Sequence, residues 1–534
     1  MKRRTNLCWI LVIMMAVSVL AAGCASPAPE PAPSPEGTAE GEPAPAPAEE
    51  KVLVMGYPRD AETLDHIKTA WYSDALIYMF DRLVTRDYDF NYQPGLAKSW
   101  DVSEDGLTWT FHLLDGVTFH NGEPMTSTDV KWTFETILDP ETASPFAGDL
   151  AAIEEINIID DLTIDFVLEY PFPNLLFNLS NTAAGIAWHG MYDEYGDEYG
   201  SKYVIGTGPY MFDEWVIGDR TVLVKNPDYN WGPEWMSNRG PALIDKVILR
   251  TIPEETSRLM ELDTGGIHIL RNITPSIYEQ IKDKDDIEVI KGAATRLGYL
   301  AYATDKEPFT DVRVRRAINH AVDRESIVQF VLRGLAEAAY GYLPPALTSE
   351  YYADSKKDGY EYDVDRAKEL LAEAGFADGL QLELSADNST ESTRLAEVLQ
   401  AQLGEAGIDV QIRLFDSASY ADHLKEGKQE LFIRIYSWPN ADILDWFLLS
   451  DQVPWPNHSR WVDATTDELI TSAARMPTWD ERAEGYKEVQ KHLIDQAVWC
   501  PIYVPDALVA VREEVKGFKF HPWMMQINDG FDLE

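Results

Sequence analysis

Strand-like and helix-like patterns alternate along residues 51–534, and no segment of about 20 to 50 residues repeats. Apolar and polar residues alternate at period two in residues 108–113 and 163–168, which predicts β-strands with one buried face. Residues 312–321 instead carry apolar side chains at helical spacing, which predicts a helix with one apolar face. The missing repeat argues against solenoids and propellers. The sequence therefore predicts a mixed α/β fold that is long enough for more than one domain.

Turn and capping residues mark the ends of two elements. Asp105 and Gly106 stand between two alternating runs, which predicts the tight turn of a β-hairpin. Residues 365–375 have helical spacing, and we expect Asp365 to be the N-cap and Gly375 to follow the last turn. These local signals support the alternation of strands and helices, but they do not assign the elements to domains.

The N-terminal residues have the pattern of a bacterial signal peptide. Basic residues at positions 2–4 precede an apolar run over residues 7–22, which is shorter than the roughly 20 residues that a membrane-spanning helix needs. Residues 20–24 read Leu-Ala-Ala-Gly-Cys, which resembles a lipobox with its leucine one position early. We therefore expect residues 1–23 to be a signal peptide and Cys24 to be lipidated. The alternative is an ordinary secretory signal with an incidental cysteine.

Residues 24–50 differ in composition from the rest of the chain. After Cys24 the segment is rich in Pro, Ala and Glu, and it holds no aromatic residue and no aliphatic residue larger than Ala. Such a segment cannot bury enough apolar area to offset the loss of chain entropy. Its prolines favour an extended chain. We expect residues 24–50 to be a disordered tether between the membrane and the folded domains.

The formal net charge is −45 at pH 7. Binding to nucleic acid requires clustered Lys and Arg, so this balance argues against nucleic acid as a partner. The acidic side chains either steer a cationic solute or simply solubilise the surface. Cys8 lies in the predicted signal peptide and Cys24 is the expected lipid site, which leaves Cys500 without a disulfide partner. Cys500 lies in an apolar run and is expected to be a buried structural residue.

Residues 96–130 carry the most distinctive motif of the chain. Two strand-like runs surround the Asp-Gly turn, and a Phe-His-Asn-Gly loop at residues 119–122 then leads to a helix. This segment resembles the signature of the extracellular solute-binding proteins of the oligopeptide/dipeptide/nickel type. Further segments resemble the same family in the same chain order: residues 206–210, 226–229, 309–324, 344–345, 407–410 and 482–511.

The resemblance implies a fold with two lobes, an extra domain inserted into the first lobe, and a ligand cleft that closes by a hinge. By motif position, the first lobe (lobe I) comprises residues 51–93, 203–295 and 506–534. The inserted domain comprises residues 94–202, and the second lobe (lobe II) comprises residues 296–505. These ranges are expectations carried over from the family.

Two segments resemble the strands with which family members contact their ligand. In peptide-binding members these edges hydrogen-bond the peptide backbone, so affinity need not depend on peptide side chains. We expect Trp438 to face the cleft, and Arg434 either to contact an anionic ligand group or to form a structural ion pair. The expected ligand-contacting residues in the two segments are Trp71, Tyr72 and Ser73 in lobe I, and Arg434, Tyr436, Ser437 and Trp438 in lobe II.

The loop after Trp438 departs from the family pattern. Members that bind peptide N-termini carry an aspartate soon after this tryptophan, which pairs with the ligand ammonium. Here its place falls on Asn440 or on Asp442, depending on where a gap is placed. If Asn440 takes that place, a charge-assisted hydrogen bond is replaced by a neutral one of about half the strength. The ligand then need not be a free peptide, and both residues remain candidate ligand contacts.

The sequence lacks the motifs of the common catalytic and metal sites. It contains no HxH, HxxxH or HExxH spacing, no GxSxG, no CxxC and no Walker A motif. Gly206 and Gly208 lack the third glycine of a dinucleotide-binding loop. We therefore expect no catalytic residues, no cofactor and no built-in metal site, although nickel-binding relatives keep a nickel complex open as the ligand.

The resemblance, together with the lipobox, implies the substrate-binding lipoprotein of an ABC importer, which captures a small solute and delivers it to the membrane permease. A short peptide is the favoured ligand, and an oligosaccharide or another solute is the alternative. A sensor or adhesin that binds without transport is a further alternative. The protein is expected to be a monomer outside the cytoplasm, in the periplasm or on the outer face of the cell membrane, attached through its lipid.

Overall fold

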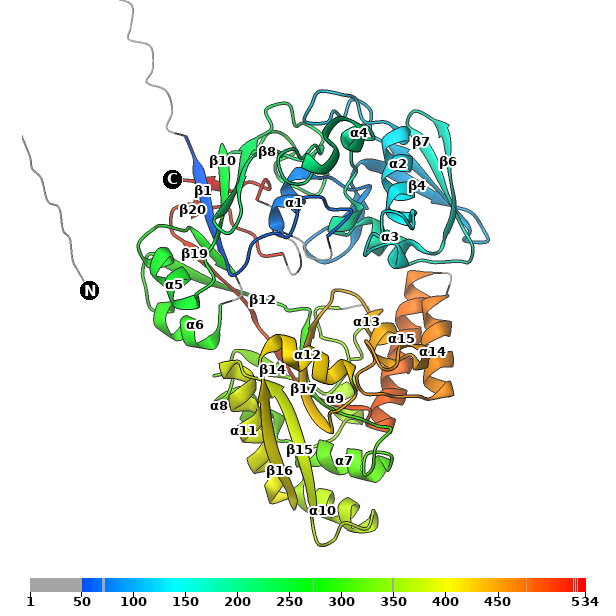
Figure 1. Ribbon diagram of the computed structural model, residues 1–534, viewed down its shortest axis with the longest axis vertical. Helices are drawn as coiled ribbons and strands as arrows, with labels where there is room; N and C mark the ends of the chain where they lie inside the picture. Colours follow the sequence, from blue (N-terminus) through cyan, green and yellow to red (C-terminus); the bar gives the residue numbers. More distant parts are fainter. Residues whose placement is uncertain are drawn as a thin grey trace, which may run out of the picture. The chain divides into compact units, whose positions relative to one another are not determined.

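The computed structural model describes residues 50–69, 73–271, 273–347, 350–476, 478–521, 523, 525 and 527–534. The predicted signal peptide, the lipid site at Cys24 and nearly all of the tether lie outside the described residues, and so do Trp71 and Tyr72. Residues 50–534 form one compact unit. Figure 1 shows this unit as two bodies, each built on a large sheet, which we call the first and the second lobe.

The first lobe is built on a seven-stranded mixed sheet. Its central strand β1 is parallel to both neighbours, β10 and β11, and buries Leu53 and Met55. In sheet order the strands are β12 (Ile287–Gly292), β19 (Ala507–Arg512), β11 (Ile269–Arg271), β1 (Val52–Tyr57), β10 (Lys246–Thr251), β9 (Arg220–Lys225) and β8 (Tyr210–Val216). This lobe also contains helices α1 (Asp74–Met79), α5 (Glu255–Asp263) and α6 (Pro275–Ile281). Two short strand pairs complete it: β2 (Val84–Arg86) with β3 (Tyr92–Pro94), and β20 (Val515–Lys516) with β21 (Asp532–Leu533).

A separate four-stranded antiparallel sheet lies between β1 and β8 in the sequence. Its strands are β4 (Ala97–Val102), β5 (Thr108–Leu113), β7 (Thr163–Leu168) and β6 (Ile153–Asp160), with helices α2 (Ser127–Leu138), α3 (Leu175–Leu179) and α4 (Met191–Tyr195). The predicted strands at residues 108–113 and 163–168 are confirmed. The predicted hairpin is confirmed too, because β4 pairs with β5 around Gly106, whose φ is +72°.

The second lobe is built on a six-stranded sheet. Its strands in order are β14 (Ala336–Ala338), β18 (Trp499–Pro505), β13 (Arg296–Tyr302), β17 (Leu431–Ser437), β15 (Leu380–Asp387) and β16 (Ile408–Phe415). The helices are α7 (Val312–Ala321), α8 (Arg324–Phe330), α9 (Ser355–Asp358), α10 (Val364–Glu373), α11 (Thr390–Glu405), α12 (Ser417–Lys425), α13 (Ile443–Leu448), α14 (Ala464–Ala474) and α15 (Trp479–Gln496). Both faces of the sheet are buried: Leu300 packs with α7 and α11, whereas Tyr299 packs with α13 and α15.

The predicted helix at residues 312–321 is confirmed as α7. The N-cap predicted for the next helical pattern is wrong: α10 begins at Val364, and its N-cap is Asp363 rather than Asp365. The Asp363 carboxylate accepts the Arg366 backbone N–H at 2.9 Å, and Asp365 then lies in the first turn, where its charge is favourable to the helix dipole. Gly375 follows the helix end with a φ of +96°, as predicted.

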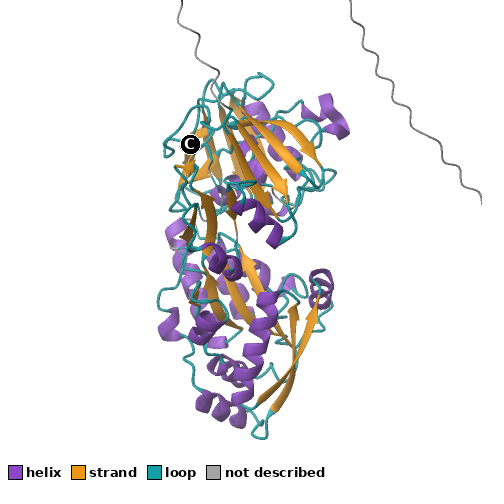
Figure 2. Cartoon of the chain, turned by 90° about the vertical axis from the view of Figure 1, so that its left-hand side faces the viewer, coloured by secondary structure: helices purple, strands orange, loops and turns teal. Residues whose placement is uncertain are grey.

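Two chain crossings join the lobes. Strand β12 of the first sheet is followed by β13 of the second, and β18 of the second sheet is followed by β19 of the first. Figure 2 shows the two lobes one above the other with these strands between them. Because each crossing is only a few residues long, it is suited to act as a hinge. None of the helices in the described part of the chain is long and apolar enough to cross a membrane.

Candidate functional site

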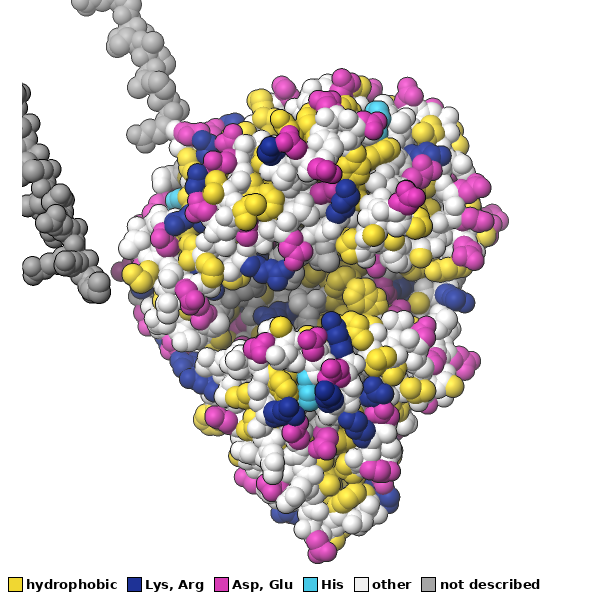
Figure 3. Space-filling view, in the orientation of Figure 1, with side chains coloured by type: hydrophobic (Ala, Val, Ile, Leu, Met, Phe, Trp, Pro, Cys, Tyr) yellow, Lys and Arg dark blue, Asp and Glu magenta, His cyan; other side chains and the backbone are white. Residues whose placement is uncertain are grey.

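An aromatic pocket with a volume of about 580 Å³ lies at the end of β17. Figure 3 shows a hollow between the two lobes, with hydrophobic side chains gathered along it. Among the described residues that line the pocket, Arg434 carries the one formal charge, and no carboxylate lines it. Pockets of this size commonly hold small ligands. The aromatic side chains of the pocket are Tyr436, Trp438, Trp446, Phe447, Trp455 and His458.

Strand β17 has an open edge beside the aromatic pocket. One edge pairs with β13 along the whole strand, from Leu431 to Ser437. The other edge pairs with β15 only at Leu431 and Phe432. From Ile433 onward, no strand of the described chain covers this edge, and the Tyr420 hydroxyl donates to the Ile433 carbonyl at 2.6 Å, so the open part begins after Ile433. The open part therefore has the form of a sheet edge that a further extended segment can join.

The hydrogen-bond pattern identifies the backbone groups that face outward from this edge. The Trp438 N–H donates to the Thr295 carbonyl at 3.0 Å, so this residue faces β13. Residues of an antiparallel pair alternate between facing their partner and facing away. Ile435 and Ser437 therefore direct their backbone N–H and C=O groups away from β13, toward the open edge.

Two polar side-chain atoms of the pocket are buried and have no hydrogen-bond partner among the described residues: Arg434 Nε and His458 Nε2. The His458 Nδ1–H donates to the Pro456 carbonyl, which leaves Nε2 as an acceptor in the neutral ring. Burial, together with the nearby charge of Arg434, lowers the pKa of His458 to about 3, so the ring is neutral at physiological pH. The pocket thus presents one cationic donor and one neutral acceptor.

The structure brings Arg434, Tyr436, Ser437 and Trp438 together around the aromatic pocket. Tyr436 is 5% exposed and donates its hydroxyl to the Tyr342 carbonyl at 2.6 Å, so it mainly supports the pocket wall. The Trp438 ring lies 5.3 Å from the Trp446 ring, measured between centroids. That these residues bind a ligand stays a prediction.

Ser73 lies in a different place. It is the N-cap of α1 and accepts the Ala75 N–H at 3.3 Å. It lines a smaller pocket of about 240 Å³ in the first lobe, together with Asp74 and Arg271. The charges of these two residues are paired, at 2.5 Å, and the Tyr57 hydroxyl donates to Asp74 at 2.6 Å. The structure therefore does not place Ser73 in the aromatic pocket, and Trp71 and Tyr72 lie outside the described residues.

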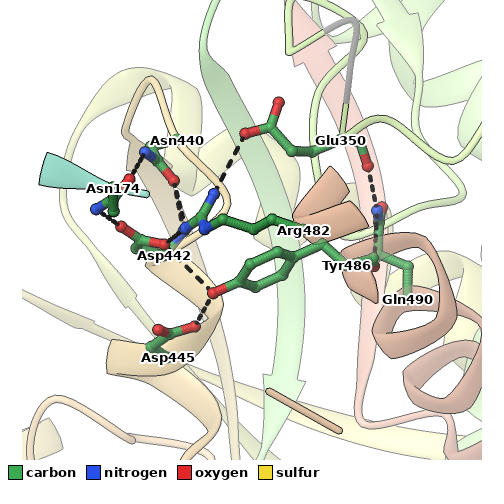
Figure 4. A network of polar contacts seen from close by, with 8 residues as sticks. All are labelled: Asn174, Glu350, Asn440, Asp442, Asp445, Arg482, Tyr486 and Gln490. Atoms are coloured by element: carbon green, nitrogen blue, oxygen red, sulfur yellow. Dashed lines mark hydrogen bonds and ion pairs between the residues drawn. The ribbon is translucent and has the colours of Figure 1, made fainter. Parts of the chain in front are cut away.

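Asn440 and Asp442 lie in an interlobe network, drawn in Figure 4. Asn174 lies in the segment inserted between β1 and β8, and it contacts Asn440 and Asp442, which belong to the second lobe. Its amide group donates to the Asp442 carboxylate and accepts the Asn440 Nδ2–H at 2.6 Å. The members of the interlobe network are Asn174, Glu350, Asn440, Asp442, Asp445, Arg482, Tyr486 and Gln490.

Arg482 lies at the centre of the interlobe network, and its side chain is 1% exposed. Its guanidinium forms an ion pair with Asp442 and donates to the Asn440 side-chain oxygen at 3.3 Å. A second carboxylate, that of Glu350, lies 3.9 Å from the guanidinium. The guanidinium also stacks on the Tyr486 ring, 4.8 Å from its centroid. The groups that surround Arg482, namely the side chains of Asp442, Asn440, Glu350 and Tyr486, thus all belong to its own lobe.

Asp445 lies beside this cluster on α13. It accepts the Tyr486 hydroxyl at 2.6 Å. Burial raises the pKa of Asp445 to about 7, although the hydrogen bond from Tyr486 opposes this shift. This carboxyl group therefore titrates near neutral pH.

Sequence reasoning missed several residues of both regions. Trp446 and Phe447 are two consecutive aromatic residues directly after the predicted loop, and such a run is a sequence signal for a pocket wall. Trp455 and His458 follow in an irregular loop with no periodic signal. Arg482 lies on α15, where only its long-range pairing distinguishes it. Among the described residues, no group of three or more His, Cys, Asp or Glu side chains is arranged to hold a metal ion.

Comparison with known proteins identifies the relatives of the chain. Residues 91–452 match the family described as bacterial extracellular solute-binding proteins, family 5. Di/tripeptide-binding protein 2 of Pseudomonas aeruginosa is 31% identical, over 80% of this chain and 84% of that protein. Heme-binding protein A of Haemophilus influenzae is 29% identical, over 81% of this chain and 82% of that protein.

Solved structures give the same result for the fold. The periplasmic binding protein DppA of Helicobacter pylori, in complex with the peptide STSA, is 29% identical with a TM-score of 0.75, over 90% of this chain and 98% of that one. The ABC transporter substrate-binding protein CtaP of Listeria monocytogenes is 25% identical with a TM-score of 0.80, over 91% of this chain and 99% of that one. The predicted two-lobed α/β fold is confirmed.

Proposed function

Because the chain belongs to family 5 of the bacterial extracellular solute-binding proteins, we propose that it is the substrate-binding lipoprotein of an ABC importer that captures a short peptide or peptide-like solute. Like the relatives that it matches, it is a solute-binding protein and not an enzyme. Several of these relatives are described as binding dipeptides or tripeptides, and one as binding glutathione, which is itself a peptide.

The observation that carries the peptide assignment is the open edge of β17 beside the aromatic pocket. A peptide in extended form supplies backbone groups that match those of Ile435 and Ser437. One of its side chains fills the aromatic pocket, where burial of an apolar group contributes about 25 cal/mol per Å². Arg434 then donates to an acceptor or an anionic group of the solute, and His458 Nε2 accepts an N–H.

Closure of the lobes completes the site in this proposal. Lobe I comprises residues 51–93, 203–295 and 506–534, with residues 94–202 inserted, and lobe II comprises residues 296–505. Trp71, Tyr72 and Ser73 approach the solute from lobe I when the cleft closes. The β12–β13 and β18–β19 crossings supply the hinge.

The remaining parts of the proposal concern the cellular location of the protein and its partners. Residues 1–23 are removed as a signal peptide, Cys24 carries the lipid, and residues 24–50 form the tether. The protein works as a monomer outside the cytoplasm and delivers its solute to the permease subunits in the membrane. The lipobox and the composition of the tether support this part of the proposal.

Native mass spectrometry of the purified protein tests the ligand class. A ladder of peptide masses that dissociate from the protein is the expected result. A single sugar adduct contradicts the peptide assignment and supports the oligosaccharide alternative. A single metal adduct contradicts it in favour of a nickel complex or a similar ligand.

The Trp438→Ala variant tests the location of the site. Loss of this aromatic wall is expected to weaken binding of the recovered solute by more than about tenfold. Trp132→Ala, on α2 and away from the pocket, is the matched control and is expected to leave the affinity unchanged. Unchanged affinity in Trp438→Ala contradicts a site at the end of β17.

A further inference from the structure

Helix α3 of the inserted segment presents two side chains to the second lobe. Asn174, directly before the helix, and Phe177 are three positions apart and therefore lie on the same helix face. Leu175 and Leu179 lie on the other face, where they are fully buried in the hydrophobic cluster that includes side chains of β5 and β7. The core of the inserted segment thus fixes α3, and the face with Asn174 and Phe177 is left to contact the second lobe.

Asn174 uses its side chain across the lobes and not within its own helix. An asparagine at an N-cap usually accepts a backbone N–H of the first turn, but the Asn174 side chain makes no such bond. It donates to the Asp442 carboxylate and accepts the Asn440 Nδ2–H at 2.6 Å, as Figure 4 shows. Asn174 is 3% exposed, so water competes little for these two bonds. One side chain therefore joins α3 to two residues that follow β17.

The Phe177 ring contacts the same part of the second lobe. Its centroid lies 6.0 Å from the centroid of the Trp438 ring. The guanidinium of Arg86, from β2 of the first lobe, lies 4.9 Å from the Phe177 centroid, which is within the range of a cation–π interaction. Phe177 itself is buried. It therefore supports the Trp438 ring from the inserted segment.

Residues 438–442, which we call the connecting loop, link these contacts to the aromatic pocket. The loop begins with Trp438, which is a wall of the pocket. It then leads directly into α13, which contributes further wall residues. Asn174 and Phe177 do not themselves line the pocket. They can therefore act on a solute in the pocket only through the connecting loop.

We propose that α3 is a positioning element of the aromatic pocket: Asn174 and Phe177 hold the connecting loop in place and thereby slow release of the solute. This inference rests on the proposed function and goes beyond it, because it gives the inserted segment a role in retaining a solute that lies in the second lobe. The solute leaves when the lobes separate, and separation breaks both contacts of α3. Loss of these contacts raises the rate of release, whereas the rate of association, which the open form sets, stays the same.

The solute-free protein tests whether α3 holds the connecting loop. Amide hydrogen exchange is measured at Trp438 and Asp442 in the wild type and in Asn174→Ala. Exchange at both amides is expected to be at least about tenfold faster in the variant. Asn181→Ala is the matched control, because Asn181 is also a buried N-cap residue of the inserted segment but accepts the Thr182 N–H of its own turn at 2.9 Å. The control is expected to leave exchange in the connecting loop unchanged.

A release experiment tests the role of α3 in retention. The probe is a pool of synthetic tripeptides of mixed sequence. Each protein is loaded with the pool and then diluted, and native mass spectrometry follows the bound peptides over time. Asn174→Ala is expected to lose peptides at least about tenfold faster than the wild type and to load at the same rate, and Asn181→Ala is expected to match the wild type in both.

Phe177→Leu is a second variant for both measurements. It keeps an apolar side chain in the buried position but removes the ring that contacts Trp438. Release is expected to be about threefold faster than in the wild type, again with an unchanged rate of loading. Circular dichroism verifies that each variant is folded. If Asn174→Ala fails to fold, Phe177→Leu decides.

The outcomes separate the two proposals. If exchange in the connecting loop is unchanged in Asn174→Ala, the inference is overturned and the peptide receptor stands. If exchange is faster but release is not, α3 holds the loop without affecting retention, which also overturns the inference. If the wild type retains no tripeptide at all, the peptide ligand of the proposed function is refuted and the role in retention falls with it.

Discussion

The aromatic pocket and the interlobe network lie beside the same loop, yet their hydrogen-bond acceptors are in opposite states. In the pocket, Arg434 Nε and His458 Nε2 are buried and have no hydrogen-bond partner among the described residues. In the network, the side chains of Asn440 and Asp442 are bonded to Arg482 and to Asn174. The pocket thus offers a free acceptor, whereas the amide and the carboxylate of the network are bonded. Arg482 Nε and Nη1, on the donor side of the network, have no hydrogen-bond partner among the described residues.

This difference separates binding from closure. A buried polar atom without a partner costs roughly 1 to 3 kcal/mol, and a solute that supplies the missing partner recovers that cost. The Asn440 and Asp442 side chains, which are already bonded, gain little from a solute, but they join the two lobes because Asn174 bonds to both of them. We therefore assign ligand recognition to the pocket and lobe contact to the network.

The largest expected effect follows from breaking the centre of the network. Arg482→Met leaves Asp442 and Glu350 without their buried counter-ion, and the free energy of unfolding is expected to fall by about 3 to 5 kcal/mol. Arg366→Met, at a side chain that is 41% exposed, is the matched control, with an expected loss below about 1 kcal/mol. Urea unfolding curves measure both values. Equal losses in the two variants would show that Arg482 is not the centre of a buried network.

A smaller effect is expected from the pocket, and it concerns affinity. Arg434→Gln removes the one charged donor of the pocket, which is expected to weaken binding of the recovered solute by about 1.5 to 3 kcal/mol. Titration calorimetry measures the change. Arg413→Gln, on β16 and away from the pocket, is the control and should bind as the wild type does. An Arg434→Gln variant that binds equally well would contradict a recognition role for this guanidinium.

The smallest effect is a pH dependence of the network. The raised pKa of Asp445, about 7 against an ordinary value of 3.8, means that the folded protein holds this proton more tightly than the unfolded chain does. Its contribution to stability is fully present below about pH 4 and is lost as the pH rises to 7. The Asp445→Asn side chain cannot titrate. The melting temperature of this variant, relative to that of the wild type, should therefore be higher at pH 8 than at pH 5.

The expected gain is about 2 °C, because the side chain is only half-buried and the chain is large. Differential scanning calorimetry at the two pH values measures it. Asp378→Asn, an exposed carboxylate on the loop after α10, serves as the control. If the difference in melting temperature between Asp445→Asn and the wild type is the same at both pH values, or shifts in favour of the wild type as the pH rises, the raised pKa of Asp445 is contradicted.

Local sequence patterns predicted the fold well, because strands, turns and helix caps are decided by neighbouring residues. The hairpin at Gly106 and helix α7 follow directly from turn chemistry and periodicity. The error at α10 has the same origin: Asp363 and Asp365 are both able to cap a helix, and only the hydrogen bond to the Arg366 N–H distinguishes them. Periodicity alone did not assign the elements to two sheets.

The candidate site was predictable only in part. Arg434, Ser437 and Trp438 come from one strand and its end, so the structure places all of them around one pocket. Asn174 and Arg482 are distant from the loop in sequence, and their pairing with Asn440 depends on how the lobes meet. No local pattern contains that information, which is why the choice between Asn440 and Asp442 could not be made from the sequence.

Amide hydrogen exchange along β17 tests the central claim most directly. If a peptide-like solute joins the open edge, exchange at the Ile435 and Ser437 amides should slow by at least about tenfold when the recovered solute is added. The Arg434 and Tyr436 amides face β13 in both states, so their exchange should change much less. Equal exchange at Ile435 and Ser437 with and without the solute would contradict binding at this edge.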